Sequence, residues 1–229
     1  MRKKNFIARL QIKVSITFIL VFTISNAFTQ NRSDNWHLKI NYASLKPFIE
    51  NDLWYVTNED YHIHPRTEDY TPGLSFSAEY EVLNRFSTEL MVLYGRPKAV
   101  LGIVDQNSSR EPLFEKGYNF LTVLLCPNVT LIGSDRSKFY LSPVCGWGFT
   151  SEVSIIPAFG PEVTWNKMNK IIYGAKTGFN IKIKNERLFF NTELFYLSLK
   201  AKITENQTNQ ELDKTFGPFG ILLGFNFSL

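Results

Sequence analysis

Two histidines and several acids near the start of this sequence have the residue types that could hold a metal ion. His62 and His64 are one residue apart, and Glu59, Asp60 and Asp69 lie close to them in the chain. Zinc sites usually need three or four ordered ligands, and this stretch contains no further histidine. We therefore interpret it as a solvated acidic loop, and we expect the protein to hold no metal and no cofactor.

Hydrolysis or acyl transfer would need a serine nucleophile within hydrogen-bond reach of a histidine. The chain has three histidines, and all of them fall in the expected first strand or in the connection that follows it: His37, His62 and His64. None belongs to a recognisable serine–histidine motif at the outer rim. We therefore expect no catalytic residues and no enzyme activity.

The elements that must position the polar side chains are clearest in residues 171–203. Apolar or small residues fall at every second position from Ile171 to Ile183, and the positions between them carry glycine, lysine and asparagine. Such an alternation is typical of a strand with one apolar face and one polar face. Asn185 and Glu186 supply a turn, after which the pattern resumes at Leu188. Both strands are longer than the usual five or six residues and suit a tilted membrane strand of about 9–11.

The same alternation recurs along the chain and predicts eight strands in all. They cover residues 36–47, 74–82, 86–96, 118–131, 139–149, 171–184, 188–203 and 217–229. Long connections (48–71, 97–117, 150–170 and 204–215) alternate with short turns (83–85, 133–137 and 185–186). Outer-membrane barrels show this pattern, with short periplasmic turns and long outer loops, and closure leaves no unpaired strand edge in lipid. The predicted fold is all-β: an eight-stranded antiparallel up-and-down transmembrane barrel over residues 28–229.

Residues 1–27 have the pattern of a secretory signal peptide. Five basic residues and no acidic ones precede an apolar run that is too short to span a bilayer as a helix, and Ser25-Asn26-Ala27 follows it. Its removal leaves 20 basic and 21 acidic residues, so the basic charge of the whole chain reflects the export signal. The net charge of the mature chain therefore gives no support for nucleic-acid binding. We expect the mature protein in the bacterial outer membrane, with membrane lipid and the barrel-assembly machinery as partners.

The chain contains two cysteines, which lie on consecutive predicted strands. The alternation places Cys126 on the inner face and Cys145 on the outer face. A disulfide needs both Cβ atoms on one side within about 4 Å. We therefore expect two free thiols.

The order of several short motifs resembles the OmpW family of small outer-membrane barrels over almost the whole mature chain. The motifs are the strand end at Pro47, residues 71–74 (TPGL), Glu89-Leu90, residues 138–143 (KFYLSP) with Gly146, Gly148 and Phe149, residues 173–178 (YGAKTG), Leu212 with residues 216–219 (FGPF), and residues 224–227 (GFNF). The chain departs from the pattern at its end, where Ser228 and Leu229 follow the last aromatic residue. The resemblance implies an eight-stranded barrel with a narrow apolar channel that is linked to passage of small hydrophobic compounds.

The polar face predicts a lumen that is divided by depth. A lower plug of paired acids and bases is expected from Lys39, Glu79, Glu81, Glu89, Lys182 and Glu193. Glu79, Glu81 and Glu89 could also act as general acids, but pairing with lysines explains them better. An apolar cup that binds the ligand is expected above the plug, from Leu45, Met91, Leu93, Tyr118, Phe120, Val144, Leu197 and Leu199. An apolar ligand would then leave laterally through the barrel wall into the membrane.

Three functions remain open at this point. The first is an outer-membrane barrel that binds or passes small hydrophobic compounds. The second is a structural or adhesive barrel with a filled lumen, whose connections 48–71 and 150–170 meet external partners. The third is a secreted lipocalin-like barrel, in which the apolar stripes would turn inward.

Overall fold

The structure, a computed structural model, describes residues 35–46, 56–58, 61–66, 71–105, 113–134, 136–156, 162–183, 187–205, 210–216 and 219–229. The predicted signal peptide, residues 1–27, lies outside the described residues. Among the residues described, no helix is long and apolar enough to cross a membrane.

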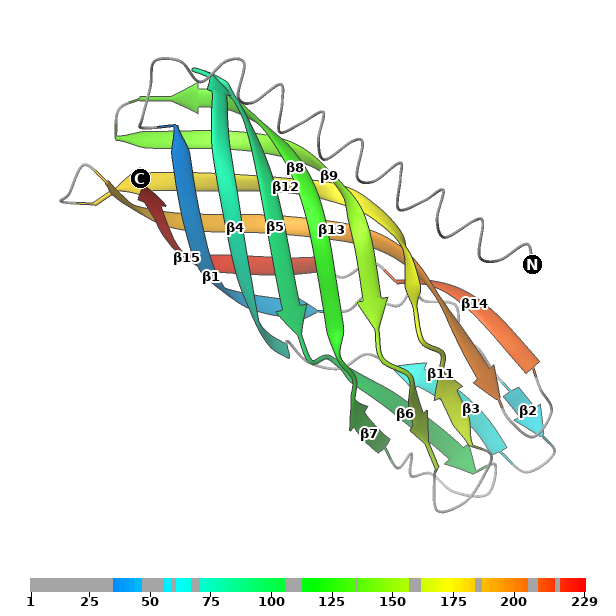
Figure 1. The fold of residues 1–229 in the computed structure, drawn as a ribbon. Coiled ribbons are helices and arrows are strands. Elements are labelled where there is room, and N and C mark those ends of the chain that lie inside the picture. The colour runs from blue at the N-terminus through cyan, green and yellow to red at the C-terminus, as the bar shows by residue number, and fades with distance from the viewer. Residues whose placement is uncertain are drawn as a thin grey trace, which may run out of the picture.

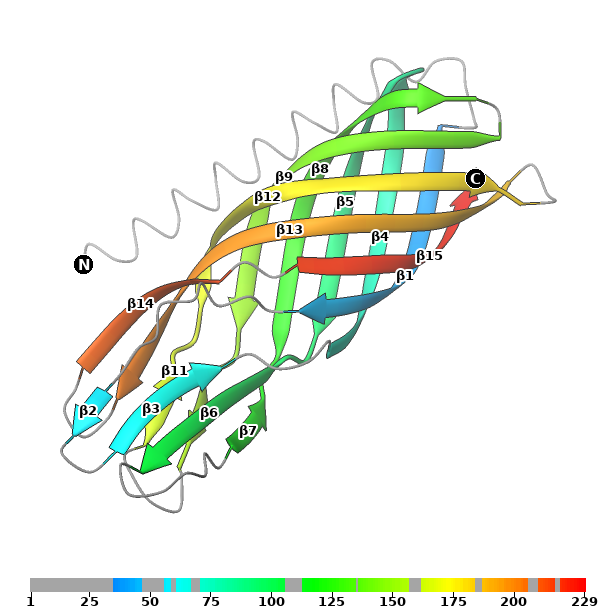
Figure 2. The same cartoon turned by 180° about the vertical axis from the view of Figure 1, so that it is seen from behind.

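Eight long strands close into an antiparallel barrel (Figures 1 and 2). They are β1 (Trp36–Lys46), β4 (Thr71–Leu83), β5 (Phe86–Gly95), β8 (Phe120–Gly133), β9 (Ser137–Thr150), β12 (Asn169–Lys182), β13 (Leu188–Glu205) and β15 (Phe219–Ser228). Each strand pairs with its neighbours in this order, and β15 pairs with β1. The predicted all-β, eight-stranded fold is confirmed.

The first and last barrel strands form the closing seam. Their register runs from His37 opposite Ser228 to Lys46 opposite Phe219, and the Leu229 amide donates to the Trp36 carbonyl at 2.9 Å. The short connections between β4 and β5, β8 and β9, and β12 and β13 lie at the same end, which we call the turn end. The opposite end, where the long connections lie, is called the loop end.

Side chains alternate between the inside and the outside along each barrel strand. The large side chains of the apolar stripes are exposed on the outer wall, such as Ile40, Phe76 and Phe225, at 46–52%. The positions between them are buried in the interior. The lipocalin-like alternative is therefore wrong, because it requires these stripes to face inward.

The long connections contain strands, which the sequence did not predict. They are β2 (Val56–Asn58), β3 (Tyr61–Arg66), β6 (Lys98–Asp105), β7 (Leu113–Gly117), β10 (Val153–Ile155), β11 (Val163–Trp165) and β14 (Gln210–Phe216). β2, β3, β6 and β7 form a separate four-stranded sheet, whereas β11 and β14 pair with the far part of β13. Together they form an extension beyond the loop end of the barrel (Figures 1 and 2).

The ladder between β8 and β9 is interrupted at two opposed prolines. The register passes from Leu125 opposite Cys145 to Val129 opposite Leu141, and the described strands show no β8–β9 pair between these two. Pro127 and Pro143 occupy the gap, and a proline has no backbone N–H to donate. Pro143 therefore lies within the closed wall, and we call this gap the wall break.

The two cysteines lie as predicted. Cys126 is buried in the interior and Cys145 is exposed on the outer wall, and both are free thiols.

Candidate functional site

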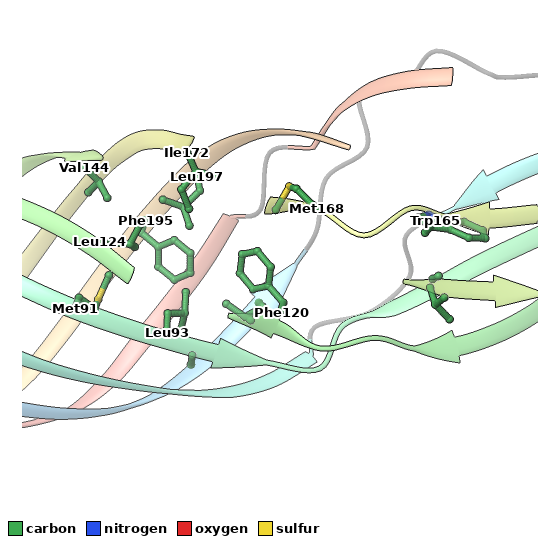
Figure 3. Packing of buried hydrophobic residues seen from close by; sticks show 14 of the residues in the cluster. Met91, Leu93, Phe120, Leu124, Val144, Trp165, Met168, Ile172, Phe195 and Leu197 are labelled. Atoms are coloured by element: carbon green, nitrogen blue, oxygen red, sulfur yellow. The ribbon is translucent and has the colours of Figure 1, made fainter. Parts of the chain in front are cut away.

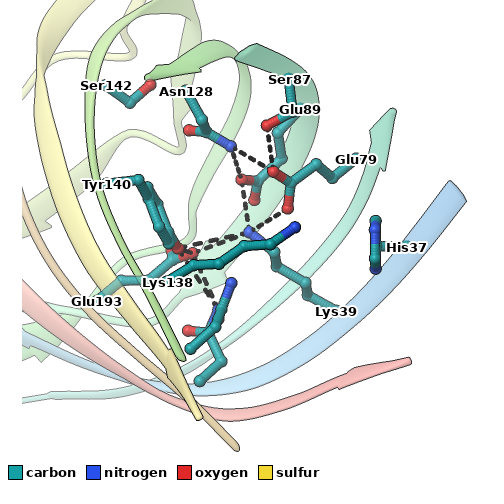
Figure 4. Close-up of polar contacts among 12 residues, drawn as sticks. His37, Lys39, Glu79, Ser87, Glu89, Asn128, Lys138, Tyr140, Ser142 and Glu193 are labelled. Carbon is teal, nitrogen blue, oxygen red and sulfur yellow. Dashed lines mark hydrogen bonds and ion pairs between the residues drawn. The ribbon is translucent and has the colours of Figure 1, made fainter. Parts of the chain in front are cut away.

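Five charged residues meet inside the barrel towards its turn end, and we call them the charge cluster. Figure 4 shows four of them: Lys39, Glu79, Glu89 and Glu193. Lys39 comes from β1, Glu79 from β4, Glu89 from β5, Lys176 from β12 and Glu193 from β13. All five occupy inward positions of their strands and are at most 8% exposed. The strands thus bring together five side chains that are far apart in the sequence.

Lys39 is the centre of the charge cluster. Its Nζ lies 2.8 Å from Glu79 Oε2, 2.9 Å from Glu89 Oε2 and 3.3 Å from Glu193 Oε1. Lys176 Nζ lies 2.6 Å from the same oxygen of Glu89 and 3.4 Å from Glu193 Oε1. Buried charges must be paired to be tolerated, and this sharing gives every carboxylate at least one ammonium partner.

Neutral side chains add further hydrogen bonds to the charge cluster. Asn128 Nδ2 donates to Glu79 Oε1 at 3.0 Å and to Glu89 Oε2 at 3.1 Å. The Ser87 hydroxyl donates to Glu79, and the Tyr140 hydroxyl donates to Glu193.

Tyr140 depends on a glycine for its position. Its ring lies over Gly178 of the neighbouring strand β12, where an added Cβ would overlap the phenol. The absence of a side chain at Gly178 therefore makes room for the aromatic ring inside a narrow barrel. The ring also lies under both lysines, with Lys39 Nζ 5.0 Å from its centroid.

The structure brings together four of the six residues predicted for the polar plug: Lys39, Glu79, Glu89 and Glu193. Glu81 is bonded instead to Lys138 and lies nearer the turn end. Lys182 is half-buried at the last position of β12, away from the charge cluster. Lys176 occupies the place that was expected for Lys182. The sequence had indicated only that the Lys176 side chain faces inward.

Above the charge cluster, towards the loop end, the interior is filled by apolar side chains (Figure 3). Phe195 projects between Leu93 and Leu124, and its ring lies over Gly220, where a Cβ would overlap it. The same cluster continues through Met168 into the extension, where it includes Trp165. We call this continuous group the apolar cluster.

Most of the residues predicted to form the ligand cup belong to the apolar cluster. Leu45, Met91, Leu93, Phe120, Val144 and Leu197 are all buried in it, and Tyr118 packs against it. Leu199 lies in β13, but its side chain is outside the described part. The sequence analysis did not single out Leu124, Ile172 and Phe195, although their inward positions in the alternation could have indicated them.

The wall break lies where the two clusters meet. On either side of the prolines, Cys126 and Val144 belong to the apolar cluster, whereas Asn128 bonds to the charge cluster. The Ser142 hydroxyl donates to the Pro127 carbonyl at 3.0 Å and so supplies a hydrogen bond within the gap.

A polar pocket opens at the turn end, below the charge cluster. Its enclosed part has room for about one water molecule, and we call it the turn-end pocket. Its lining includes His37, Glu79, Glu81, Lys138 and Asn226. The described residues contain no group of three or more histidines, cysteines or acids that could hold a metal ion. The side chains of His62 and His64 lie outside the described part.

The described geometry defines the class of this protein as a small eight-stranded barrel with the fold of outer-membrane proteins. The chain matches no protein-family model and no curated protein sequence. Solved structures match it in fold. The outer membrane protein OprG from Pseudomonas aeruginosa matches with a TM-score of 0.59 at 11% identity, over 87% of this chain and 97% of that one.

Two further solved structures share the fold. The outer membrane protein AlkL, determined in DMPC lipid bilayers, matches with a TM-score of 0.54 at 14% identity, over 88% of this chain and 92% of that one. Neisserial surface protein A matches with a TM-score of 0.51 at 11% identity, over 85% and 97%. Identities this low establish the architecture alone.

Proposed function

We propose that this protein resides in a bacterial outer membrane, where it takes small hydrophobic compounds from outside and releases them sideways into the membrane without chemical change. The exposed apolar wall supports the membrane location. The turn end then faces the periplasm and the loop end faces outwards. On the sequence motifs above, we further propose that the chain is a member of the OmpW family.

One observation carries the proposed function: the apolar cluster ends at the charge cluster, and the wall break lies at their junction. An apolar compound that replaces or displaces side chains of the apolar cluster gains nothing by moving further inward, because the next layer consists of paired charges. The route of lower free energy leads through the wall. The wall break offers that route, since backbone pairing is already missing there.

Replacing an interior valine by tryptophan tests this proposal. Val144→Trp places a larger side chain in the apolar cluster beside the wall break, whereas Val123→Trp makes the same change on the outer wall, where the side chain is 37% exposed. Uptake of a radiolabelled alkane is measured in cells that carry each variant, and folding is checked by the shift in gel mobility on heating. We expect Val144→Trp to reduce uptake about tenfold and Val123→Trp to leave it unchanged. Equal uptake by both folded variants would refute the proposal.

The second candidate is a structural or adhesive barrel, and both the filled interior and the paired strands of the extension favour it. Paired strands at the loop end present a defined surface to the outside, as a binding protein for external partners requires. Under this alternative, disrupting the extension abolishes partner binding, while Val144→Trp has no effect on any activity.

A further inference from the structure

Two β-bulges shape the outer wall at the turn end. The register of β4 against β5 shifts just before Leu83, and the register of β8 against β9 shifts just before Ile132. Leu83 then lies opposite Phe86, and Ile132 lies opposite Phe139, and both partners are exposed on the outer wall. Directly opposite residues of an antiparallel pair share a face, so each bulge turns one more large apolar side chain outward.

The bulges carry the apolar outer wall as far as the turns. Leu83 is 69% exposed and Ile132 is 73% exposed, and the residues before them, Val82 and Leu131, are exposed as well. Contiguous apolar surface of this kind is favourable only against an apolar partner. A lipid chain that lies along the wall therefore keeps an apolar contact up to the level of the turns.

Each of the three short turns ends in an exposed arginine that directly precedes the next strand. These arginines are Arg85 before β5, Arg136 before β9 and Arg187 before β13. The backbone carbonyl of each accepts a hydrogen bond from an amide of the neighbouring strand, and the donors are Thr130, Lys182 and Ser228, at 2.8–2.9 Å. The barrel wall thus fixes the backbone of each arginine, while the side chain is exposed.

The three guanidinium groups have no acidic partner in the part of the chain that the structure describes. None of the three arginines forms a salt bridge there, whereas Lys138 is bonded to Glu81. Residues 81–86, 133–138 and 182–187 contain six basic and three acidic residues, so the charge of the turn end is positive by sequence. Residues 82–86, which surround Arg85, contain no acid.

Arg85 lies between the two bulges. Its turn joins β4, which carries the bulge at Leu83, to β5, and its carbonyl bonds to β8, which carries the bulge at Ile132. A molecule bound here would meet a guanidinium group at the turn and aliphatic side chains on the adjoining wall.

We infer that the turn end binds glycerophospholipids through their phosphate groups, with its principal site at Arg85. This inference rests on the membrane location proposed above. The fork of donors on a guanidinium group matches two oxygens of a phosphate, and the acyl chains of the lipid cover Leu83 and Ile132. An acidic protein in the periplasm fits this surface less well, because it would leave these two side chains in water.

Native mass spectrometry of the full mature protein in a neutral detergent tests this inference. The probe is dioleoylphosphatidylglycerol, and the comparison compounds are dioleoylglycerol, which lacks the phosphate, and glycerol phosphate, which lacks the acyl chains. We expect saturable binding of the phospholipid alone. Equal binding of dioleoylglycerol would show an apolar contact only, and equal binding of glycerol phosphate would show a simple anion site. Either result, or no saturable binding of the phospholipid, would overturn the inference.

Matched variants localise the binding. Arg85→Gln removes the charged donors, and we expect it to weaken phospholipid binding about tenfold, the usual effect of losing a hydrogen bond to a charged group. Arg96→Gln is the control and leaves binding unchanged, because the Arg96 side chain lies beside Gly117 of the extension.

A second pair of variants tests the apolar part of the site. Leu83→Gln removes aliphatic surface next to Arg85, and we expect weaker binding. Ile156→Gln makes the same kind of change beyond the barrel strands, at a position 75% exposed, and leaves binding unchanged. Unaltered binding in both Arg85→Gln and Leu83→Gln refutes the site.

Alkane uptake separates this inference from the proposed function. We expect Arg85→Gln to leave uptake unchanged, and we expect Val144→Trp, which lies in the apolar cluster, to reduce uptake and to keep phospholipid binding. Normal uptake without saturable phospholipid binding overturns this inference alone. Phospholipid binding together with equal uptake by Val144→Trp and Val123→Trp overturns the proposed uptake alone.

Discussion

At the scale of single residues, Lys39 is predicted to contribute strongly to stability. It is 1% exposed and serves three carboxylates, so Lys39→Met leaves buried negative charge with fewer partners. We expect the free energy of unfolding in lipid vesicles to fall by about 3–5 kcal/mol. The measurement is urea unfolding followed by tryptophan fluorescence.

The matched control for Lys39→Met is Lys98→Met in the extension. The Lys98 side chain is 52% exposed and pairs with Glu115. An exposed pair of this kind contributes about 0–1 kcal/mol. Similar losses in the two variants would show that burial adds nothing to the importance of Lys39.

Gly178 provides a second prediction at the residue scale. Gly178→Ala places a Cβ in the space of the Tyr140 ring and pushes the phenol away from Glu193. We expect a loss of about 1–3 kcal/mol, as is usual for overpacking. Gly117→Ala is the control, because its Cβ would meet only the flexible Arg96 side chain at 3.3 Å. The same unfolding assay compares the two, and equal stability would contradict the role of Gly178.

The face of each side chain could be predicted from the sequence, but its depth in the barrel could not. Alternation placed Lys39, Glu89 and Glu193 inside correctly, because parity alone decides the face of a strand residue. Lys182 and Lys176 share a face, and only the stagger between tilted strands decides which of them reaches the carboxylates. A lysine has a long side chain, so counting residues along one strand does not show which carboxylate it contacts.

At the scale of the elements, the barrel strands could be predicted and the strands of the extension could not. The barrel strands are long and alternate over many residues, whereas β10 and β11 have three residues each, too few to show an alternation. β11 pairs with the far part of β13, which continues beyond the barrel, and β10 pairs with β11. Such pairing between distant segments leaves no period in the local sequence.

A substitution of Trp165 tests what stabilises the extension. It is 6% exposed in β11 and packs with the part of the apolar cluster that lies beyond the barrel. Removal of a buried tryptophan costs about 3–5 kcal/mol. We therefore expect Trp165→Ala to make the extension sensitive to protease, while the barrel itself keeps its gel shift on heating.

The control for Trp165→Ala is Trp147→Ala on β9. Trp147 is half-buried at the outer wall and bonds to Asn169 of the next strand. Its loss leaves the extension resistant to protease. Equal cleavage in both variants, or in neither, would contradict a stabilising role for Trp165.

At the scale of the whole molecule, the outer wall decides where the protein resides. Val92 lies near the middle of β5 and is 36% exposed on that wall. Val92→Lys places a charge in hydrocarbon, and we expect it to reduce the free energy of folding into lipid vesicles by about 2–4 kcal/mol. Ile156→Lys, at a position 75% exposed beyond the barrel strands, serves as control and should be neutral. A neutral Val92→Lys would place the wall in water.

The closing seam between β1 and β15 has a consequence for how the chain folds. Two partners at opposite ends of the sequence must find each other, and such a high contact order makes folding slow. Until they pair, each strand has an unpaired edge, and another unfolded chain can pair with that edge and aggregate. We therefore expect the unassembled chain to aggregate unless its strand edges are shielded until β1 and β15 pair.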